Sequence, residues 1–198
     1  VLSNALILPL LPKFSKFKSN KDIKSLEKSL TLGIEYCFLT TFFLTGFFIT
    51  FNNQIIQFVF QRGAFNYEAV ILVKHILIAY SAGIPFYLCR DLLVRTYYTI
   101  EKPRLPFQLS LAGIIFNVFF DWFLLGAPVN NLGNLSPYNF GVIGIVLSSG
   151  IVNLIICIIL YANFNFYKIN LPKVILLKKI FLISLASSIT SVICNSVI

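Results

Sequence analysis

Long apolar runs separated by short polar and basic segments make up most of this 198-residue sequence. No charged residue occurs between Tyr36 and Gln61, a stretch longer than the roughly 20 residues that a helix needs to cross the hydrocarbon core of a bilayer. The runs are apolar on every side and do not alternate, which indicates helices among lipid and other helices rather than barrel strands. We therefore expect an all-α, polytopic membrane fold.

The positions of these runs predict four complete transmembrane helices and two partial ones. The complete helices are expected at about residues 32–51, 69–98, 107–126 and 141–162; the partial ones are expected at 1–11 and 176–196. Pro12 is expected to end the first partial helix, and residues 12–30 to form a basic loop. The sequence contains no Met and opens inside an apolar run that lacks the features of a signal peptide. We expect it to be an internal piece of a longer protein.

Composition excludes a soluble domain. Hydrophobic residues make up 58% of the chain, charged residues 12%, and the mean hydropathy is +0.85, whereas a soluble domain carries about a quarter charged residues. The net charge of +9 suggests a nucleic-acid partner only for a soluble protein. Here we assign it to Lys and Arg retained on one side of a membrane, and we expect no nucleic-acid partner.

Basic residues collect in alternate connections between the expected helices. Thirteen of the 16 Lys and Arg residues lie there: Lys13, Lys16, Lys18, Lys21, Lys24, Lys28, Arg95, Lys102, Arg104, Lys168, Lys173, Lys178 and Lys179. Because basic residues mark the cytoplasmic side, loops 12–30, 99–106 and 163–175 are expected to be cytoplasmic. The first of these loops spaces its lysines every three or four residues. That spacing fits an amphipathic helix lying on anionic lipid headgroups as well as a solvated connector.

The sequence carries no enzyme motif. His75 is the only histidine, so a complete Ser-His-Asp or Cys-His arrangement is impossible within the chain. The four cysteines lie inside apolar stretches without CxxC spacing and are interpreted as small buried hydrophobes. We therefore expect no enzyme activity from these residues, and we expect no metal and no cofactor.

Charges at membrane depth are the candidate functional residues, because such charges are costly and usually face a cavity or a partner. Arg90, Asp91 and Arg95 lie on the second expected span. We name Arg90 and Arg95 as candidate substrate-binding residues for an anionic headgroup. The alternative is that they extend to the cytoplasmic interface, which we favour for Arg95. Asp121, beside Trp122, is interpreted as an interfacial residue.

Three stretches resemble one known family. They are VLSNALILPLLPKFSK at residues 1–16, FQRGAF at 60–65, and AYSAGIPFYLCRDLLVRTYYTIEKPRLP at 79–106. Together they are similar to the MurJ/MviN family of lipid II flippases, in the multidrug/oligosaccharidyl-lipid/polysaccharide exporter superfamily. The resemblance implies a fourteen-helix, two-lobe fold, of which this chain would be the C-terminal-lobe region from the end of the eighth helix through the thirteenth.

The same resemblance implies a cargo and its surroundings. The cargo would be the undecaprenyl-pyrophosphate-linked peptidoglycan precursor, moved from the inner to the outer leaflet of the bacterial plasma (inner) membrane. The partners would be membrane lipid and the missing N-terminal lobe of the same protein. Two other hypotheses stay open at this point: a related exporter of a polysaccharide lipid or a drug, and a membrane scaffold without transport activity.

Overall fold

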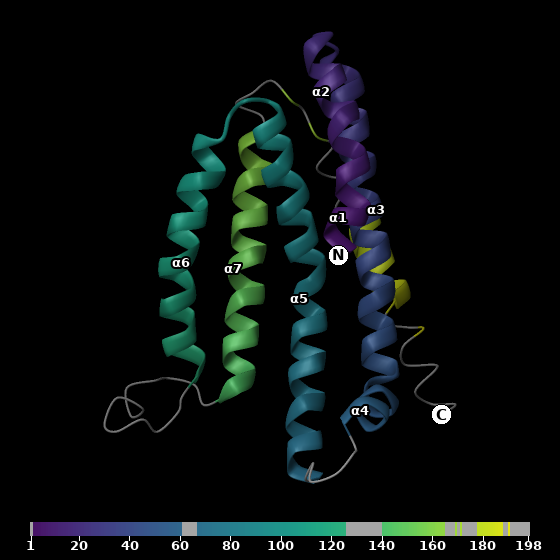
Figure 1. Ribbon diagram of the computed structural model, residues 1–198, viewed down its shortest axis with the longest axis vertical. Coiled ribbons are helices and arrows are strands. Elements are labelled where there is room, and N and C mark those ends of the chain that lie inside the picture. The colour runs from purple at the N-terminus through teal and green to yellow at the C-terminus, as the bar shows by residue number, and fades with distance from the viewer. Residues whose placement is uncertain are drawn as a thin grey trace.

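The computed structural model describes residues 2–60, 67–125, 140–164, 169, 171, 178–187 and 190, and within these ranges the chain is helical with no strand (Figure 1). The elements in order are α1 (Leu2–Ile7), the 3-10 turn η1 (Leu8–Leu10), α2 (Leu11–Ser19), α3 (Ile23–Thr50), α4 (Asn52–Phe60), α5 (Tyr67–Thr99), α6 (Arg104–Leu125) and α7 (Val142–Asn163). Residues 178–187 are helical as well.

Four of these helices are long and apolar enough to cross a membrane: 23–50, 69–99, 104–125 and 142–163. Helix α5 packs against α3 on one side and α7 on the other, and α6 packs against α7. The four helices run in alternating directions with nearly parallel axes (Figure 1). The chain is therefore a segment of a multi-pass integral membrane protein.

Most of the basic loop expected at 12–30 is helical, which is one of the two forms that its lysine spacing allowed. Pro12 does not end a helix but occupies the first turn of α2, where its missing N–H has no helical partner to lose. Helix α3 begins at Ile23 because the carboxylate of Asp22 accepts a hydrogen bond from the Ser25 backbone N–H at 3.1 Å. The turn between the two helices is only residues 20–22.

The other bounds lie close to the expected ones, with two differences. Helix α4 follows α3 directly, at a place where the sequence suggested the exit of a span (Figure 1). Of the expected helix at 176–196, residues 178–187 are described and helical, and most of the rest lies outside the described residues.

Helix α5 continues through Pro85 because a neighbouring helix replaces the lost hydrogen bond. A proline lacks the N–H that would bond to the carbonyl four residues earlier, which is Ser81. The hydroxyl of Thr45, on α3, donates to that carbonyl at 2.8 Å. Both Thr45 and Ser81 are buried, so this bond supplies a donor to a carbonyl that has lost its usual partner at position 85.

On its other side, α5 approaches α7 closely through glycine. A Cβ built on Gly83 would lie 3.4 Å from the Cα of Gly150, so the two backbones are nearly in contact. Nearer the C-terminal ends of α5 and α7, the buried core forms where α3, α5 and α7 meet, around Ile34, Leu93 and Leu160.

Candidate functional site: charges on helix α5

Three charged residues lie near the C-terminal end of α5. At 1.5 Å of rise per residue, Arg90 lies about 14 Å, Asp91 about 12 Å and Arg95 about 6 Å before the helix end at Thr99. Arg90 and Asp91 therefore lie within the apolar span. Arg95 is close enough to the helix end for its side chain to extend toward an interface.

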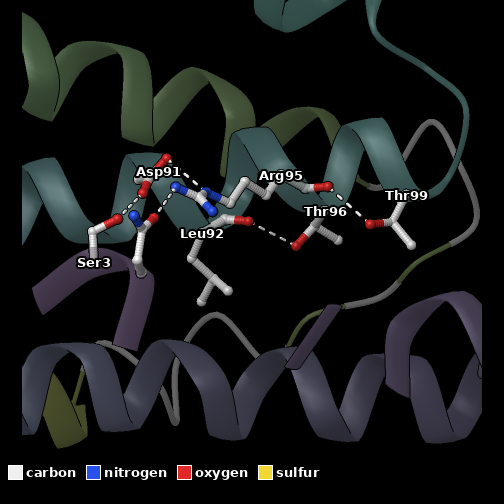
Figure 2. A network of polar contacts seen from close by, with 7 residues as sticks. Ser3, Asp91, Leu92, Arg95, Thr96 and Thr99 are labelled. Atoms are coloured by element: carbon white, nitrogen blue, oxygen red, sulfur yellow. Dashed lines mark hydrogen bonds and ion pairs between the residues drawn. The ribbon is translucent and has the colours of Figure 1, made fainter. Parts of the chain in front are cut away.

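Arg95 is bound to a carboxylate and to α1. Its Nε lies 3.1 Å from Asp91 Oδ1, and its Nη2 donates to Asn4 Oδ1 at 2.9 Å. Figure 2 shows Ser3 of α1 pointing at Asp91, and the Ser3 hydroxyl donates to Asp91 Oδ2. Roughly a quarter of the Arg95 and Asp91 side chains is exposed. The charge of Arg95 is therefore balanced within the network.

Arg90 has a neutral partner instead. Its Nη1 donates to Oδ1 of Asn153, on α7, at 2.8 Å. The Asn153 amide is itself held by donating to the Ser149 carbonyl at 2.8 Å. An amide oxygen orients a guanidinium without neutralising it, so Arg90 keeps a positive charge at membrane depth.

The structure does not bring the two predicted arginines together. Five residues of α-helix rotate a side chain by about 140° from its starting direction. Accordingly Arg90 bonds to α7 and Arg95 bonds to α1. They belong to two contacts on different faces of α5.

Sequence reasoning missed the partners of both arginines. Asn153 is an amide within the apolar run at 141–162. Its position was a usable signal, because polar side chains in membrane helices commonly hydrogen-bond to another helix. Ser3 and Asn4 precede the prolines of the first partial span and had no comparable signal.

A second polar contact joins α6 to α7. Ser148, fully buried on α7, donates to the carboxylate of Asp121 on α6. One turn earlier on α6, Oδ1 of Asn117 is buried without a hydrogen-bond partner among the described residues. The interpretation of Asp121 as an interfacial residue therefore missed its role in packing α6 on α7. Gly144 permits this approach, because a Cβ there would lie 2.6 Å from the Leu124 carbonyl oxygen.

Metal-binding groups were sought across the described ranges. No cluster of three or more His, Cys, Asp or Glu residues that could hold a metal ion occurs among them. Cys37, Cys89 and Cys157 are free and buried, and Cys194 lies outside the described residues.

Two carboxylates beyond the ends of the spans have perturbed pKa values. Hydrogen bonds from Ser25 hold the pKa of Asp22 below its usual value of 3.8. Glu101 lies 2.6 Å from the ammonium of Lys18, and this partner lowers the pKa of Glu101 below 4.5. Both groups are therefore ionised at neutral pH.

Comparisons with known proteins point to one family. A family model described as Lipid II flippase MurJ matches residues 1–198. The chain is 36% identical over 154 residues to a probable lipid II flippase MurJ of Synechocystis sp., which covers 78% of this chain and 27% of the relative. It is 30% identical over 146 residues to the lipid II flippase MurJ of Thermosipho africanus, covering 68% of this chain and 27% of that protein. The chain thus spans about a quarter of the length of these relatives.

A solved structure shows the same fold. The chain superposes with a TM-score of 0.69 and 24% identity on a structure titled lipid II flippase MurJ, inward closed conformation, covering 98% of this chain and 36% of that one. Two of the three stretches that carried the resemblance, 1–16 and 79–106, lie almost entirely within the described residues; of 60–65, only Phe60 does. On the match of the family model over its whole length, this chain belongs to the lipid II flippase MurJ family.

Proposed function

We propose that this chain forms part of a flippase that moves lipid II, the undecaprenyl-pyrophosphate-linked peptidoglycan precursor, from the inner to the outer leaflet of the bacterial inner membrane. The observation that carries the proposal is the family match over residues 1–198. The names of the relatives, all lipid II flippases or probable ones, support the choice of cargo. The protein is on this proposal a transporter and not an enzyme.

The chemistry of the cargo explains why such a protein needs charges at membrane depth. A pyrophosphate and its sugars cannot cross hydrocarbon alone, because burying unpaired charge costs many kcal/mol. A flippase lowers this barrier with a cationic, hydrated cavity that opens to one side at a time. Membrane potential contributes about 2.3 kcal/mol for each charge that moves through 100 mV.

Within this chain, Arg90 is the better candidate for contact with the anionic headgroup. Its partner Asn153 is neutral and holds the guanidinium in place through one of its nitrogens, so other N–H groups of Arg90 stay available to an anion. Arg95 supports the site more weakly, because Asp91 already balances its charge. We therefore assign cargo contact to Arg90 and a structural role to Arg95.

The orientation follows from charge. Helix α2, the start of α3 and the turn from α5 to α6 lie at the same end of the bundle (Figure 1). That end carries Lys13, Lys16, Lys18, Lys21, Lys24, Lys28, Lys102 and Arg104. The positive-inside rule places this basic end in the cytoplasm. A cysteine introduced at position 19 should then be labelled by an impermeant maleimide only after the membrane is permeabilised.

The test of the cargo is depletion of the full-length protein in a strain without a redundant flippase. Lipid II should disappear from the outer face of the inner membrane and accumulate on the inner face. Continued appearance of lipid II outside would overturn the proposal. If a polysaccharide lipid or a drug were retained instead, the protein would be an exporter of that cargo. Unchanged transport of every cargo would indicate a scaffold.

A further inference from the structure

We infer that a pocket at the basic end of the chain, between α2, α3 and the end of α5, binds one anionic phospholipid. The pocket has a volume of about 360 Å³. Lys18, Lys21 and Lys102 stand around it, and its floor is apolar: Phe17, Ile23, Leu26, Ile100 and Ile169. This inference does not depend on which cargo the protein moves.

Two matching helix ends bring the lysines together. At the end of α2, the Asp22 N–H donates to the Phe17 carbonyl at 2.9 Å; at the end of α5, the Lys102 N–H donates to the Tyr97 carbonyl at 2.9 Å. Each closure places one residue in the left-handed conformation, Lys21 with φ 56° and Glu101 with φ 57°. Glycine usually occupies this position because it adopts positive φ without strain. Here both positions carry long charged side chains.

An ion pair joins the two ends and leaves an excess of positive charge. Lys18 Nζ lies 2.6 Å from Glu101 Oε1, and the Glu101 side chain is 84% exposed. Asp22, between the pocket residues Lys21 and Ile23 in the sequence, accepts a hydrogen bond from the Ser25 N–H. The two remaining lysines of the pocket, Lys21 and Lys102, are exposed and stand over its apolar floor.

The mixture of charge and apolar surface decides the class of ligand. A soluble anion would meet the lysines but leave the apolar floor wet, and an apolar molecule would leave the ammonium groups unmatched. Ile23 is 44% exposed although it lines the pocket. The pocket residues belong to the end of α2, the start of α3 and the end of α5, which lie together at the basic end of the bundle (Figure 1), where lipid headgroups are within reach of the lysines. A phospholipid with a net negative headgroup satisfies both parts of the surface.

The test measures lipid binding by the purified full-length protein by native mass spectrometry. The probes are phosphatidylglycerol, phosphatidylcholine with the same acyl chains, and inorganic phosphate. One variant removes the pocket lysines (Lys18→Gln, Lys21→Gly, Lys102→Gln). A matched control removes three lysines of the same segment that do not line the pocket (Lys13→Gln, Lys16→Gln, Lys24→Gln). Each pocket lysine should contribute about fivefold to phosphatidylglycerol affinity, and the control should lose less than twofold.

Single variants separate binding from folding. Lys21→Gly relieves the left-handed strain, so the melting temperature should hold or rise while phosphatidylglycerol affinity falls about fivefold. Glu101→Gln breaks the ion pair but frees Lys18, so affinity should hold or rise.

The proposal fails if the two triple variants lose affinity equally, since general attraction then explains the binding. It also fails if phosphatidylcholine binds as tightly as phosphatidylglycerol, if inorganic phosphate competes at similar concentrations, or if Glu101→Gln weakens binding as Lys18→Gln does.

Discussion

Helix α5 contacts its neighbours through two faces that differ in the partners of their charged side chains and in how closely the backbones approach. Toward α7 it offers Gly83, which approaches Gly150, and Arg90, whose partner Asn153 is neutral. Toward α1 it presents Asp91, whose carboxylate balances the charge of Arg95 and accepts a hydrogen bond from the Ser3 hydroxyl of α1. On α3, the Thr45 hydroxyl also donates a hydrogen bond to the Ser81 backbone carbonyl of α5.

The difference supports the proposal that Arg90, and not Arg95, contacts the cargo. A compensated ion pair with further hydrogen bonds fixes helices in place, and it attracts an outside anion weakly. An arginine held only by an amide is positioned and still charged. Glycine contacts of the kind between α5 and α7 also let helices pack closely. The following changes test this contrast, from the largest expected effect to the smallest.

Asp91→Ala should destabilise the protein most. It leaves Arg95 without its carboxylate partner, and breaking a buried pair costs about 3 kcal/mol at the lower end of the usual range. The lower end applies because about a quarter of each side chain is exposed. The measurement is the thermal unfolding midpoint in detergent. Replacing Asp91 and Arg95 together with Ala should cost less than Asp91→Ala alone, and a larger cost would contradict the pairing.

Gly150→Leu should disrupt the opposite face. A Cβ at position 150 would already touch the Gly83 Cα, at 3.6 Å, so we expect the further atoms of leucine to push α5 and α7 apart, at a cost of about 2 kcal/mol. Gly150→Ala is the matched control and should change the unfolding midpoint little. Equal tolerance of both side chains would show that the backbones are not in close contact in the membrane.

Arg90→Gln should lower transport with little loss of stability. Glutamine keeps a donor for Asn153 but removes the charge, so lipid II transport should fall about tenfold, equivalent to about 1.4 kcal/mol. Arg95→Gln is the comparison and should affect the unfolding midpoint more than transport. Complementation by Arg90→Ala at the wild-type level would remove Arg90 from the proposed site.

Thr45→Val should cost about 1 kcal/mol, because it removes the hydrogen bond that the Thr45 hydroxyl donates to the Ser81 carbonyl in place of the Pro85 N–H. Thr40→Val is the control: its hydroxyl donates to the Tyr36 carbonyl, within α3 itself. The unfolding midpoint should be lower for Thr45→Val than for Thr40→Val. Thr45→Ser, which keeps the hydroxyl, should be less destabilised than Thr45→Val; equal destabilisation would show that the hydrogen bond to the Ser81 carbonyl does not account for the cost.

Acidification should produce the smallest effect. Lys18 lowers the pKa of Glu101 below its usual 4.5, so the folded state favours the ionised carboxylate. The stabilisation is complete above about pH 4.5 and is lost as the pH falls through the lower folded pKa. Unfolding midpoints between pH 3 and 6 should therefore show a shallower acid decline in Glu101→Gln than in the wild type, and high salt should reduce the difference.

Apolar periodicity and charge placement were sufficient to predict four spans, because the length of a membrane helix follows from bilayer thickness. They were insufficient at the ends of helices. Pro12 suggested a stop, yet a proline is equally suited to a first turn. Asp22 set the start of α3 some nine residues before the expected one, since lysines in a helix that extends past the bilayer resemble lysines in a loop.

The sequence by itself determined that this chain resides in a membrane, that it has four complete spans within the described residues, and that charges lie at depth on the second of them. Those properties depend on the transfer of each residue between water and lipid, which is local. Only the tertiary structure decided that Arg90 and Arg95 face apart, that Thr45 completes the helix around Pro85, and that Lys18, Lys21 and Lys102 share one pocket. Those properties depend on which side chains meet across helices, and no spacing along one helix specifies the partner on another.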